Sequence, residues 1–267
     1  MAADFTTLKD KTTEELFAQT LEGEYDDECP WDAVSALRVR GTSEVFQEAV
    51  NFCNSTDPLK RARGIDILAQ LGKKMKDNGP HFDERVSICL HHISDGDIIV
   101  LRSAAYALGY LGTEKCIEEL IKLTDHMDAG VRHAVAVGLM GNPKGVSSLI
   151  KLIEDEDDEV RNWATFSLGM ISTGDTPEIR NALKRRLEDS FGEVRAEAMW
   201  GLSQRKDPVG LKMLLDCIDD DDECLSGDLM AAAETLDVDY DTPVSDLRAG
   251  LRKILESLDE KRCETKC

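Results

Sequence analysis

The fold is decided by the stretch 157-DDEVRNWATFSLGM-170, because two other segments of the chain align with it without gaps. These copies are 128-DAGVRHAVAVGLMG-141 and 191-FGEVRAEAMWGLSQ-204. Each has an acidic or turn residue, a Val-Arg pair, and then small and apolar residues at helical spacing that include a leucine. Internal similarity of this kind is the signature of a repeat protein.

Weaker copies extend the pattern toward both ends of the chain. They are 57-DPLKRARGIDILAQ-70, 97-DIIVLRSAAYALGY-110, 31-WDAVSALRVR-40 and 225-LSGDLMAAAETL-236. Second amphipathic stretches lie between the copies, at residues 43–53, 81–92, 114–124, 144–154, 178–188 and 209–218. The sequence therefore predicts an all-α, right-handed α-solenoid of about seven helix pairs. We expect one continuous solenoid over residues 1–260 and a flexible tail at 261–267.

Local signals within the copies predict how the helices end and how the pairs are joined. Glycines near the ends of the second helices, Gly109, Gly141 and Gly169, are expected to stop those helices by adopting positive φ. The acidic residue before each Val-Arg pair is expected to cap its helix. The recurring arginines Arg132, Arg161 and Arg195 are expected to be structural, each bonding the acidic turn of the adjacent repeat.

The charge of the chain restricts its partners. The 267 residues carry 53 acidic against 32 basic side chains, a formal net charge of -21. Binding of nucleic acid needs clustered lysine and arginine, so we expect no nucleic-acid partner. An acidic surface instead attracts basic proteins, although the same charge could serve only to keep the protein soluble.

The cysteines and the apolar segments predict a cytoplasmic location and no membrane contact. The eight cysteines are dispersed without a CxxC pair, as expected for reduced thiols in a cytoplasm. The first ten residues, MAADFTTLKD, lack the basic start and apolar stretch of a signal peptide. No stretch approaches the ~18 apolar residues that a membrane span needs.

Aligning the copies predicts the residues of a concave binding face. One column holds Asp66, Tyr106, Val137, Phe166, Trp200 and Glu234, and the next holds Gln70, Tyr110, Gly141, Met170 and Gln204. From these columns and the turn before them, the predicted partner-binding residues are Tyr106, Tyr110, His133, Asn162, Trp163, Phe166, Met170 and Trp200. The alternative is that the tryptophans and Phe166 pack between repeats as core.

Acidic runs predict a second binding surface beside that face. They fall between the first and second helix of a repeat, so stacking would place them along one edge of the solenoid. The predicted acidic ridge consists of Glu154, Asp155, Glu156, Asp157, Asp158, Asp219, Asp220, Asp221 and Asp222. The alternative is that each run is a solvated turn with capping duty.

Nothing in the chain resembles a catalytic or metal-binding motif. Phosphate loops, GxSxG, HExxH and the kinase motifs are all missing. The adjacent His91 and His92 make a poor metal pair, and the DDDDE run at 219–223 lacks the alternation and glycine of a calcium loop. We therefore expect no enzymatic activity, no catalytic residue, no cofactor and no metal.

The segment 158–208 resembles HEAT-like repeats of the kind grouped with phycobilin-lyase repeats. It resembles more closely the YibA-type HEAT-repeat proteins encoded beside Rhs polymorphic toxins. The resemblance rests on VRNWA at 160–164, on EVRAEAMWGLSQRKD at 193–207 and on AVSALRVRG at 33–41. It implies an immunity protein that binds and neutralises a cognate toxin, and it assigns no contact residues.

The leading hypothesis is therefore a non-catalytic immunity protein with a basic protein partner, its oligomeric state left open. The alternatives are a phycobilin-lyase-like enzyme or subunit, and a general assembly scaffold. A HEAT-fold DNA-repair glycosylase is disfavoured, because it needs a basic concave channel.

Overall fold

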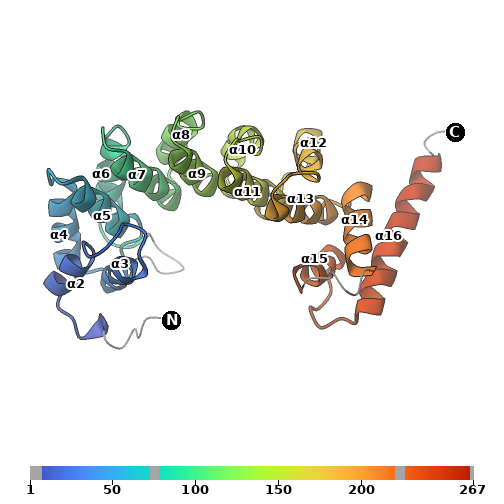
Figure 1. Cartoon of the computed structure of the whole chain (residues 1–267), viewed down its shortest axis with the longest axis horizontal. Coiled ribbons are helices and arrows are strands. Elements are labelled where there is room, and N and C mark those ends of the chain that lie inside the picture. Colours follow the sequence, from blue (N-terminus) through green and yellow to red (C-terminus); the bar gives the residue numbers. More distant parts are fainter. Residues whose placement is uncertain (1–7, 73–77, 220–225, 265–267) are drawn as a thin grey trace. The chain divides into compact units, whose positions relative to one another are not determined.

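The computed structural model describes residues 8–72, 78–219 and 226–264, and these residues form helices joined by turns, with no strand among them (Figure 1). The all-α prediction is confirmed. The helices are α2 (Thr13–Gln19), α3 (Glu28–Arg40), α4 (Ser43–Cys53), α5 (Pro58–Ala69), α6 (Phe82–His92), α7 (Ile98–Leu111), α8 (Glu114–Lys122), α9 (Ala129–Gly138), α10 (Val146–Leu152), α11 (Asp158–Phe166), α12 (Pro177–Arg186), α13 (Gly192–Gln204), α14 (Pro208–Asp219), α15 (Ser226–Leu236) and α16 (Val244–Glu264). A 3₁₀ turn, η1 (Pro143–Gly145), precedes α10, and a π-helical turn, η2 (Ser167–Ile171), extends α11.

The helices follow one another as antiparallel pairs, which is the arrangement that the repeat predicted. The expected stretch 43–53 coincides with α4, and 209–218 falls within α14. Each quoted copy of the Val-Arg repeat provides the second helix of a pair, as α9, α11 and α13. No helix among the described residues is both long and apolar enough to span a bilayer.

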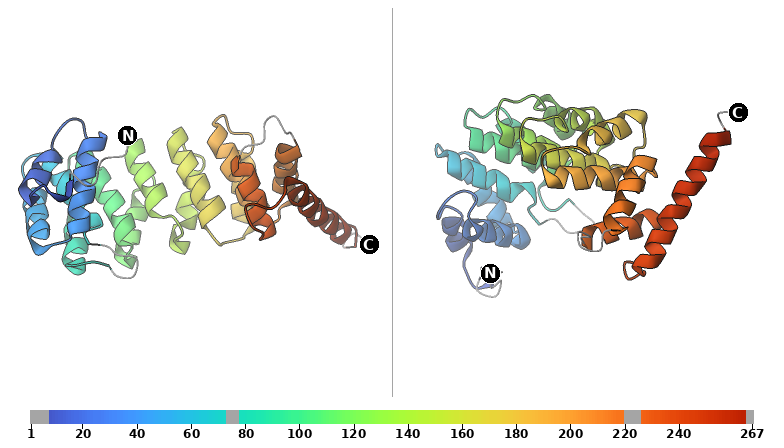
Figure 2. Two further views of the ribbon diagram at one scale, coloured as in Figure 1. Left: turned by 90° about the horizontal axis from the view of Figure 1, so that it is seen from below. Right: turned by 45° about the vertical axis from the view of Figure 1, so that its right-hand side comes forward.

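The chain divides into two compact units, residues 1–139 and residues 140–267. The first contains α2 to α9, and the second contains η1, α10, α11, η2 and α12 to α16. In the second unit the long helix α16 packs on both α14 and α15 (Figure 2). The single solenoid over residues 1–260 stays a prediction. Helix α16 continues to Glu264, and residues 265–267 of the expected tail lie outside the described residues.

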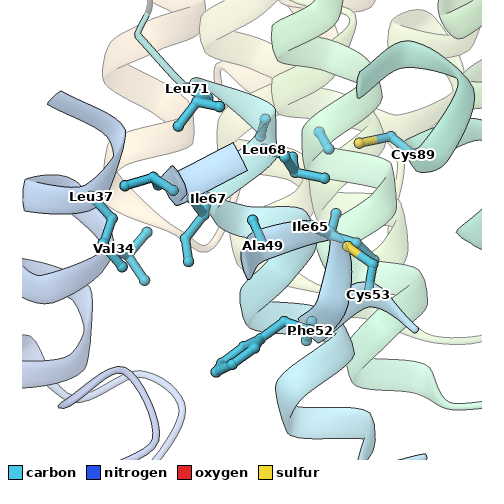
Figure 3. Close-up of a cluster of buried hydrophobic side chains, with 14 of the residues drawn as sticks. Val34, Leu37, Ala49, Phe52, Cys53, Ile65, Ile67, Leu68, Leu71 and Cys89 are labelled. Atoms are coloured by element: carbon cyan, nitrogen blue, oxygen red, sulfur yellow. The ribbon is translucent and has the colours of Figure 1, made fainter. Parts of the chain in front are cut away.

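The core of the first unit is a continuous cluster of aliphatic side chains and thiols between successive pairs. Leu37 of α3, Ala49 of α4 and Leu68 of α5 are fully buried members of this cluster (Figure 3). Burying side chains of this kind stabilises a protein by about 1.5–3 kcal/mol each. A short helix pair has one such apolar stripe on each side, so each pair completes the core of its neighbour.

Two of the three glycines expected to end helices have another role. Gly141 does adopt positive φ (70°), but α7 ends at Leu111 with Gly112 (φ 63°) as its C-cap, and Gly109 and Gly169 lie inside helical turns. A Cβ atom on Gly109 would lie 2.4 Å from the Cα atom of Gly138. The expectation was therefore wrong for Gly109 and Gly169, which let neighbouring helices touch at backbone distance.

The caps follow the predicted pattern in two of the three strong copies. Asp128 accepts a hydrogen bond from the backbone N–H of Val131, and Asp157 caps α11 in the same way. In the third copy Phe191 occupies the N-cap position, so no side chain caps α13. The carboxylate of Asp189 accepts instead from the Phe191 N–H at 3.0 Å.

The predicted bond from a repeat arginine to the acidic turn of the next repeat is found for Arg161. Arg161 of α11 donates to both carboxylate oxygens of Asp189 at 3.1 Å, in the turn before α13. In the first unit Arg61 of α5 reaches Asp95 in the same bidentate way at 3.0 Å. Arg132 and Arg195 donate to carbonyls of their own preceding turns. Planar bidentate pairs fix the orientation of one repeat on the next.

Candidate functional site

The predicted binding residues fall in both units, so each unit contains its own candidate site. In the first unit the side chains of Tyr106 and Tyr110, one turn apart on α7, line a cavity of about 240 Å³. The opposite wall comes from α3 and the turn before it, and includes Tyr25, Trp31 and Arg38. Asp66 of α5, which belongs to the same alignment column as Tyr106, lies in this wall too.

Asp66 is the most unusual group of this cavity, because its carboxylate is only 4% exposed. Burial raises its pKa, while Arg38 and Arg63 oppose that rise. The Tyr25 hydroxyl donates to Asp66 at 2.8 Å and lies 2.8 Å from the Ser103 hydroxyl. This network ties α3, α5 and α7 together, so the carboxylate serves first to hold the cavity wall.

Guanidinium groups stack on the aromatic rings of the same wall. The Arg63 guanidinium lies 4.2 Å from the ring centre of Tyr25 and 5.0 Å from that of Trp31. Arg38 lies 5.6 Å from the Trp31 ring and donates to the backbone carbonyl of Asp66 at 2.9 and 2.7 Å. The aromatic faces on this side of the cavity are therefore already used by the protein's own cations.

The opposite side of the cavity is more open. Tyr110 is 44% exposed. Tyr106 is half-buried, and its hydroxyl shares a hydrogen bond with Nδ1 of His133 on α9. Burial raises the pKa of Tyr106 to about 12, so its hydroxyl stays protonated at neutral pH. The structure thus brings Tyr106, Tyr110 and His133 onto neighbouring helices of one unit, as the alignment predicted.

The predicted aromatic residues of the second unit are half-buried. Trp163 and Phe166 meet edge to face, with ring centres 5.9 Å apart. The indole N–H of Trp200 donates to Asp228 at 3.1 Å, and the ring lies against the backbone of Gly227. All three rings make internal contacts and retain some exposed surface, so their role in binding stays a prediction.

Two buried side-chain oxygen atoms of the second unit have no hydrogen-bond partner in the structure, Oδ1 of Asn162 and Oε2 of Glu197. Burial raises the pKa of Glu197 to about 7. Glu197 occupies in α13 the position that Trp163 occupies in α11. A carboxyl group in this state gains hydrogen-bonding capacity as a donor when it is protonated.

A second cavity, of about 490 Å³, lies in the second unit at the ends of η2, α13 and α15. Its lining contains Met170 and Gln204, which share one alignment column, and Glu234, which belongs to the other. Val238 and Tyr240 from the chain after α15 complete its apolar wall. The two columns thus predicted residues of both cavities without predicting that cavities would form.

Most residues of the predicted acidic ridge that the structure describes have internal partners. Glu154 accepts from Arg185 and Arg186 at 2.6 and 2.7 Å, Asp157 caps α11, and Asp158 pairs with Arg161. Asp219 pairs with Arg248 and Arg252. Asp155 accepts from the backbone N–H of Asp157, and Glu156, although exposed, also interacts within the chain. Asp220, Asp221 and Asp222 lie outside the described residues.

The arginine side chains, like these carboxylates, have partners within the protein. Every arginine whose side chain the structure describes donates to a backbone carbonyl or a carboxylate of the protein itself. Buried Arg85, for example, donates to four carbonyls around the end of α5. The guanidinium groups that the structure describes are therefore all engaged within the chain.

Possible metal ligands and thiols are the remaining reactive groups among the described side chains. No group of three or more histidine, cysteine or carboxylate side chains in that part of the chain could hold a metal ion. Burial raises the pKa of the Cys53 thiol to about 12 and that of Cys89 also, which keeps both sulfurs protonated.

Sequence reasoning missed the residues of the first cavity that come from outside the aligned copies. Tyr25 lies in a turn and meets Asp66 across 41 residues of chain. Arg38 and Trp31 were quoted only as part of a weak copy. Asp237 and Tyr240, in the second cavity, follow the last copy. Their positions depend on how the chain turns after each helix, which no repeat specifies.

Comparisons with known proteins agree with this architecture. A profile of HEAT repeats matches residues 86–169 and 146–237. Protein YibA of Escherichia coli strain K12 is 28% identical over 190 residues, or 67% of this chain and 66% of that protein. The match thus spans slightly less than two thirds of the length of that relative.

Two solved structures share the fold. The X-ray structure of E. coli YibA superposes with a TM-score of 0.73 at 23% identity, covering 94% of this chain and 95% of that one. A structure of Kap95p with RanGDP gives a TM-score of 0.60 at 12% identity, covering 96% of this chain and 42% of the other. At such low sequence identities, the similarity concerns the fold alone.

Proposed function

Because the chain belongs to the HEAT-repeat family, we propose that it is a non-catalytic protein whose task is to bind a basic protein partner. We propose further that it acts as an immunity protein, which holds and neutralises a cognate toxin in the cytoplasm of the cell that makes both. The finer role is suggested by the resemblance to YibA-type proteins, whose genes lie beside those of Rhs toxins.

The observation that carries this proposal is the internal use of the arginines. The chain has a net charge of -21, and the described guanidinium groups are already bonded to carbonyls and carboxylates of the scaffold. A surface of this kind raises the local concentration of a basic partner and speeds its association. It disfavours nucleic acid for the same reason.

A protein partner is also what a structural neighbour binds. Kap95p, which shares the fold, is described in complex with RanGDP, which is itself a protein. Exposed apolar side chains of the present chain, including Tyr110 and Tyr240, provide the surface that a desolvated contact needs. Charge would then steer the partner, and these side chains would hold it.

The proposal is tested by capturing partners from the cytoplasm of the source cell with tagged protein, at moderate and then at high salt. We expect one stoichiometric basic protein that is released at high salt. The double variant Glu159→Gln/Glu193→Gln removes two exposed charges from the first turns of α11 and α13, and should weaken capture by about 3- to 10-fold.

The matched control is Glu256→Gln/Asp259→Asn, which removes the same charge from exposed positions of α16. It should leave capture within about twofold of the unmodified protein. Absence of any stoichiometric basic protein would refute the proposal, and so would capture of nucleic acid in its place. Equal weakening by both variants would indicate attraction without a defined surface.

A further inference from the structure

The cavity at the ends of η2, α13 and α15 has a wall that is fixed by a single arginine. The five N–H groups of Arg205 are directed at five backbone carbonyls, those of Leu168, Gly169, Ser172, Gly174 and Gly201, at 2.7–3.0 Å. A guanidinium group has five N–H donors in all. Arg205 therefore orders the π-helical turn and the loop after it, and has no donor left for a ligand.

The remaining polar side chains of the cavity favour a ligand that donates hydrogen bonds. Glu234 accepts from the Tyr240 hydroxyl at 3.1 Å and from the Gln204 amide at 3.0 Å, which fixes its carboxylate in the cavity lining. Each carboxylate oxygen can accept a further hydrogen bond. Asp237 adds a second carboxylate to the lining. An anionic ligand would meet these two carboxylates and no available guanidinium donor.

The apolar part of the lining fits an extended aliphatic or planar group. Tyr240 and Val238 are 65% and 42% exposed, and Met170 of η2 lines the same cavity. Isolated exposed apolar residues are ordinary, but here Tyr240, Val238 and Met170 line one cavity of about 490 Å³ together with two carboxylates.

We propose that this cavity receives an arginine side chain of the basic partner protein. The guanidinium would donate to Glu234 and Asp237 and lie over the Tyr240 ring, and the methylene groups would pack on Met170 and Val238. Arginine suits this lining better than lysine, because its planar group both stacks on aromatic rings and donates along two directions at once. The inference deepens the proposed function and rests on it for the identity of the partner.

The test uses a probe that does not depend on that partner. The methyl resonances of Met170 and Val238 are followed by NMR in the full-length protein during titration with N-acetyl-arginine amide. N-acetyl-citrulline amide, which has nearly the same shape but no charge, is the control ligand. We expect saturable shifts with a Kd on the order of 1 mM for the arginine derivative and at least about tenfold weaker binding of the citrulline derivative.

Two variants locate the binding within the cavity. Glu234→Gln keeps an acceptor for Tyr240, and Asp237→Asn keeps a residue that tolerates the positive φ of 57° found there. Each should weaken arginine binding at least about threefold, while Glu256→Gln on α16 should not change it. Unchanged thermal melting would show that the variants are folded.

The proposal is overturned if Met170 and Val238 do not shift, if citrulline binds as well as arginine, or if the cavity variants bind like the unmodified protein. Because the probe is an amino-acid derivative, the titration measures binding in the cavity whether or not a basic protein is captured from cells. Capture of a basic protein together with a silent cavity would refute this inference and leave the proposed function standing.

Discussion

Gly201 of α13 offers the sharpest test of how the repeats are packed. A Cβ atom at this position would lie 2.4 Å from the Cα atom of Gly169 and 3.2 Å from Cδ1 of Leu183. Carbon atoms need about 3.5–4.0 Å, so α13 and η2 would have to separate by about 1 Å. The obstructing atom belongs to the backbone and cannot rotate away.

The cost can be estimated by comparing two effects of opposite sign. Alanine is favoured over glycine in a helix by about 1 kcal/mol. Over-packing of a close contact costs about 1–3 kcal/mol and occasionally more, and the backbone position of the clash places Gly201→Ala at the upper end. We expect a net loss of about 2 kcal/mol in the free energy of unfolding.

The same helix provides the control. Gly192, the first residue of α13, is exposed, and a Cβ atom there would have its nearest contact 3.6 Å away, at the Arg195 guanidinium. Gly192→Ala should therefore be neutral or stabilise slightly. Urea unfolding of both variants, followed by far-UV circular dichroism, measures the difference. If Gly201→Ala is as stable as Gly192→Ala, α13 and η2 do not meet at backbone distance.

Three further predictions concern single side chains. Burial raises the pKa of Glu197 from 4.5 to about 7, so its carboxyl group ionises more readily in the unfolded chain than in the folded one. The free energy of unfolding should therefore fall by about 1–3 kcal/mol as the pH rises from 4.5 to 7. Glu197→Gln should remove this slope in urea titrations at pH 5 and pH 8, and an unchanged slope would assign it to another group. Arg61 lowers the pKa of Asp95 to about 2, so its contribution is present above pH 4 and lost as the pH falls from 3.8 toward 2. Asp95→Asn should cost about 1–2 kcal/mol at pH 7 and almost nothing at pH 2, whereas an equal loss at both would contradict the ion pair. Arg205→Lys leaves three donors for five carbonyls and should cost about 2–3 kcal/mol in thermal or urea melts, so unchanged stability would show that the carbonyls find water instead.

The sequence predicted elements well wherever a repeat specified them, because helical periodicity and capping act over a few residues. The stretch 43–53 became α4 without a shift at either end, and Asp157 caps α11 as expected. Gly109 shows the limit of the same reasoning. Its place near a helix end predicted that it would end the helix. Its role is instead to allow close contact with Gly138 of another helix, which only the packed structure reveals.

The candidate sites were predictable to the extent that one face of the repeat is shared by all copies. Alignment placed Tyr106 and Tyr110 on one face of a helix, and both line the first cavity. It could not place Tyr25 there, because that contact closes a loop of 41 residues. Charge runs were the least informative pattern, because the sequence does not show whether a carboxylate such as Glu154 faces solvent or pairs with two arginines, as it does here.

This last point bears on how a scaffold of this kind can recognise a partner. Because Asp157 and Asp158 are committed to a helix start and to Arg161, substituting either would disturb a repeat as well as a surface. Carboxylates that neither cap a helix nor pair with a repeat arginine, such as Glu159 and Glu193, can be substituted without disturbing a repeat. Adaptation to a new basic partner should therefore occur at such positions and around the two cavities, while the residues that carry the repeat pattern stay fixed by packing.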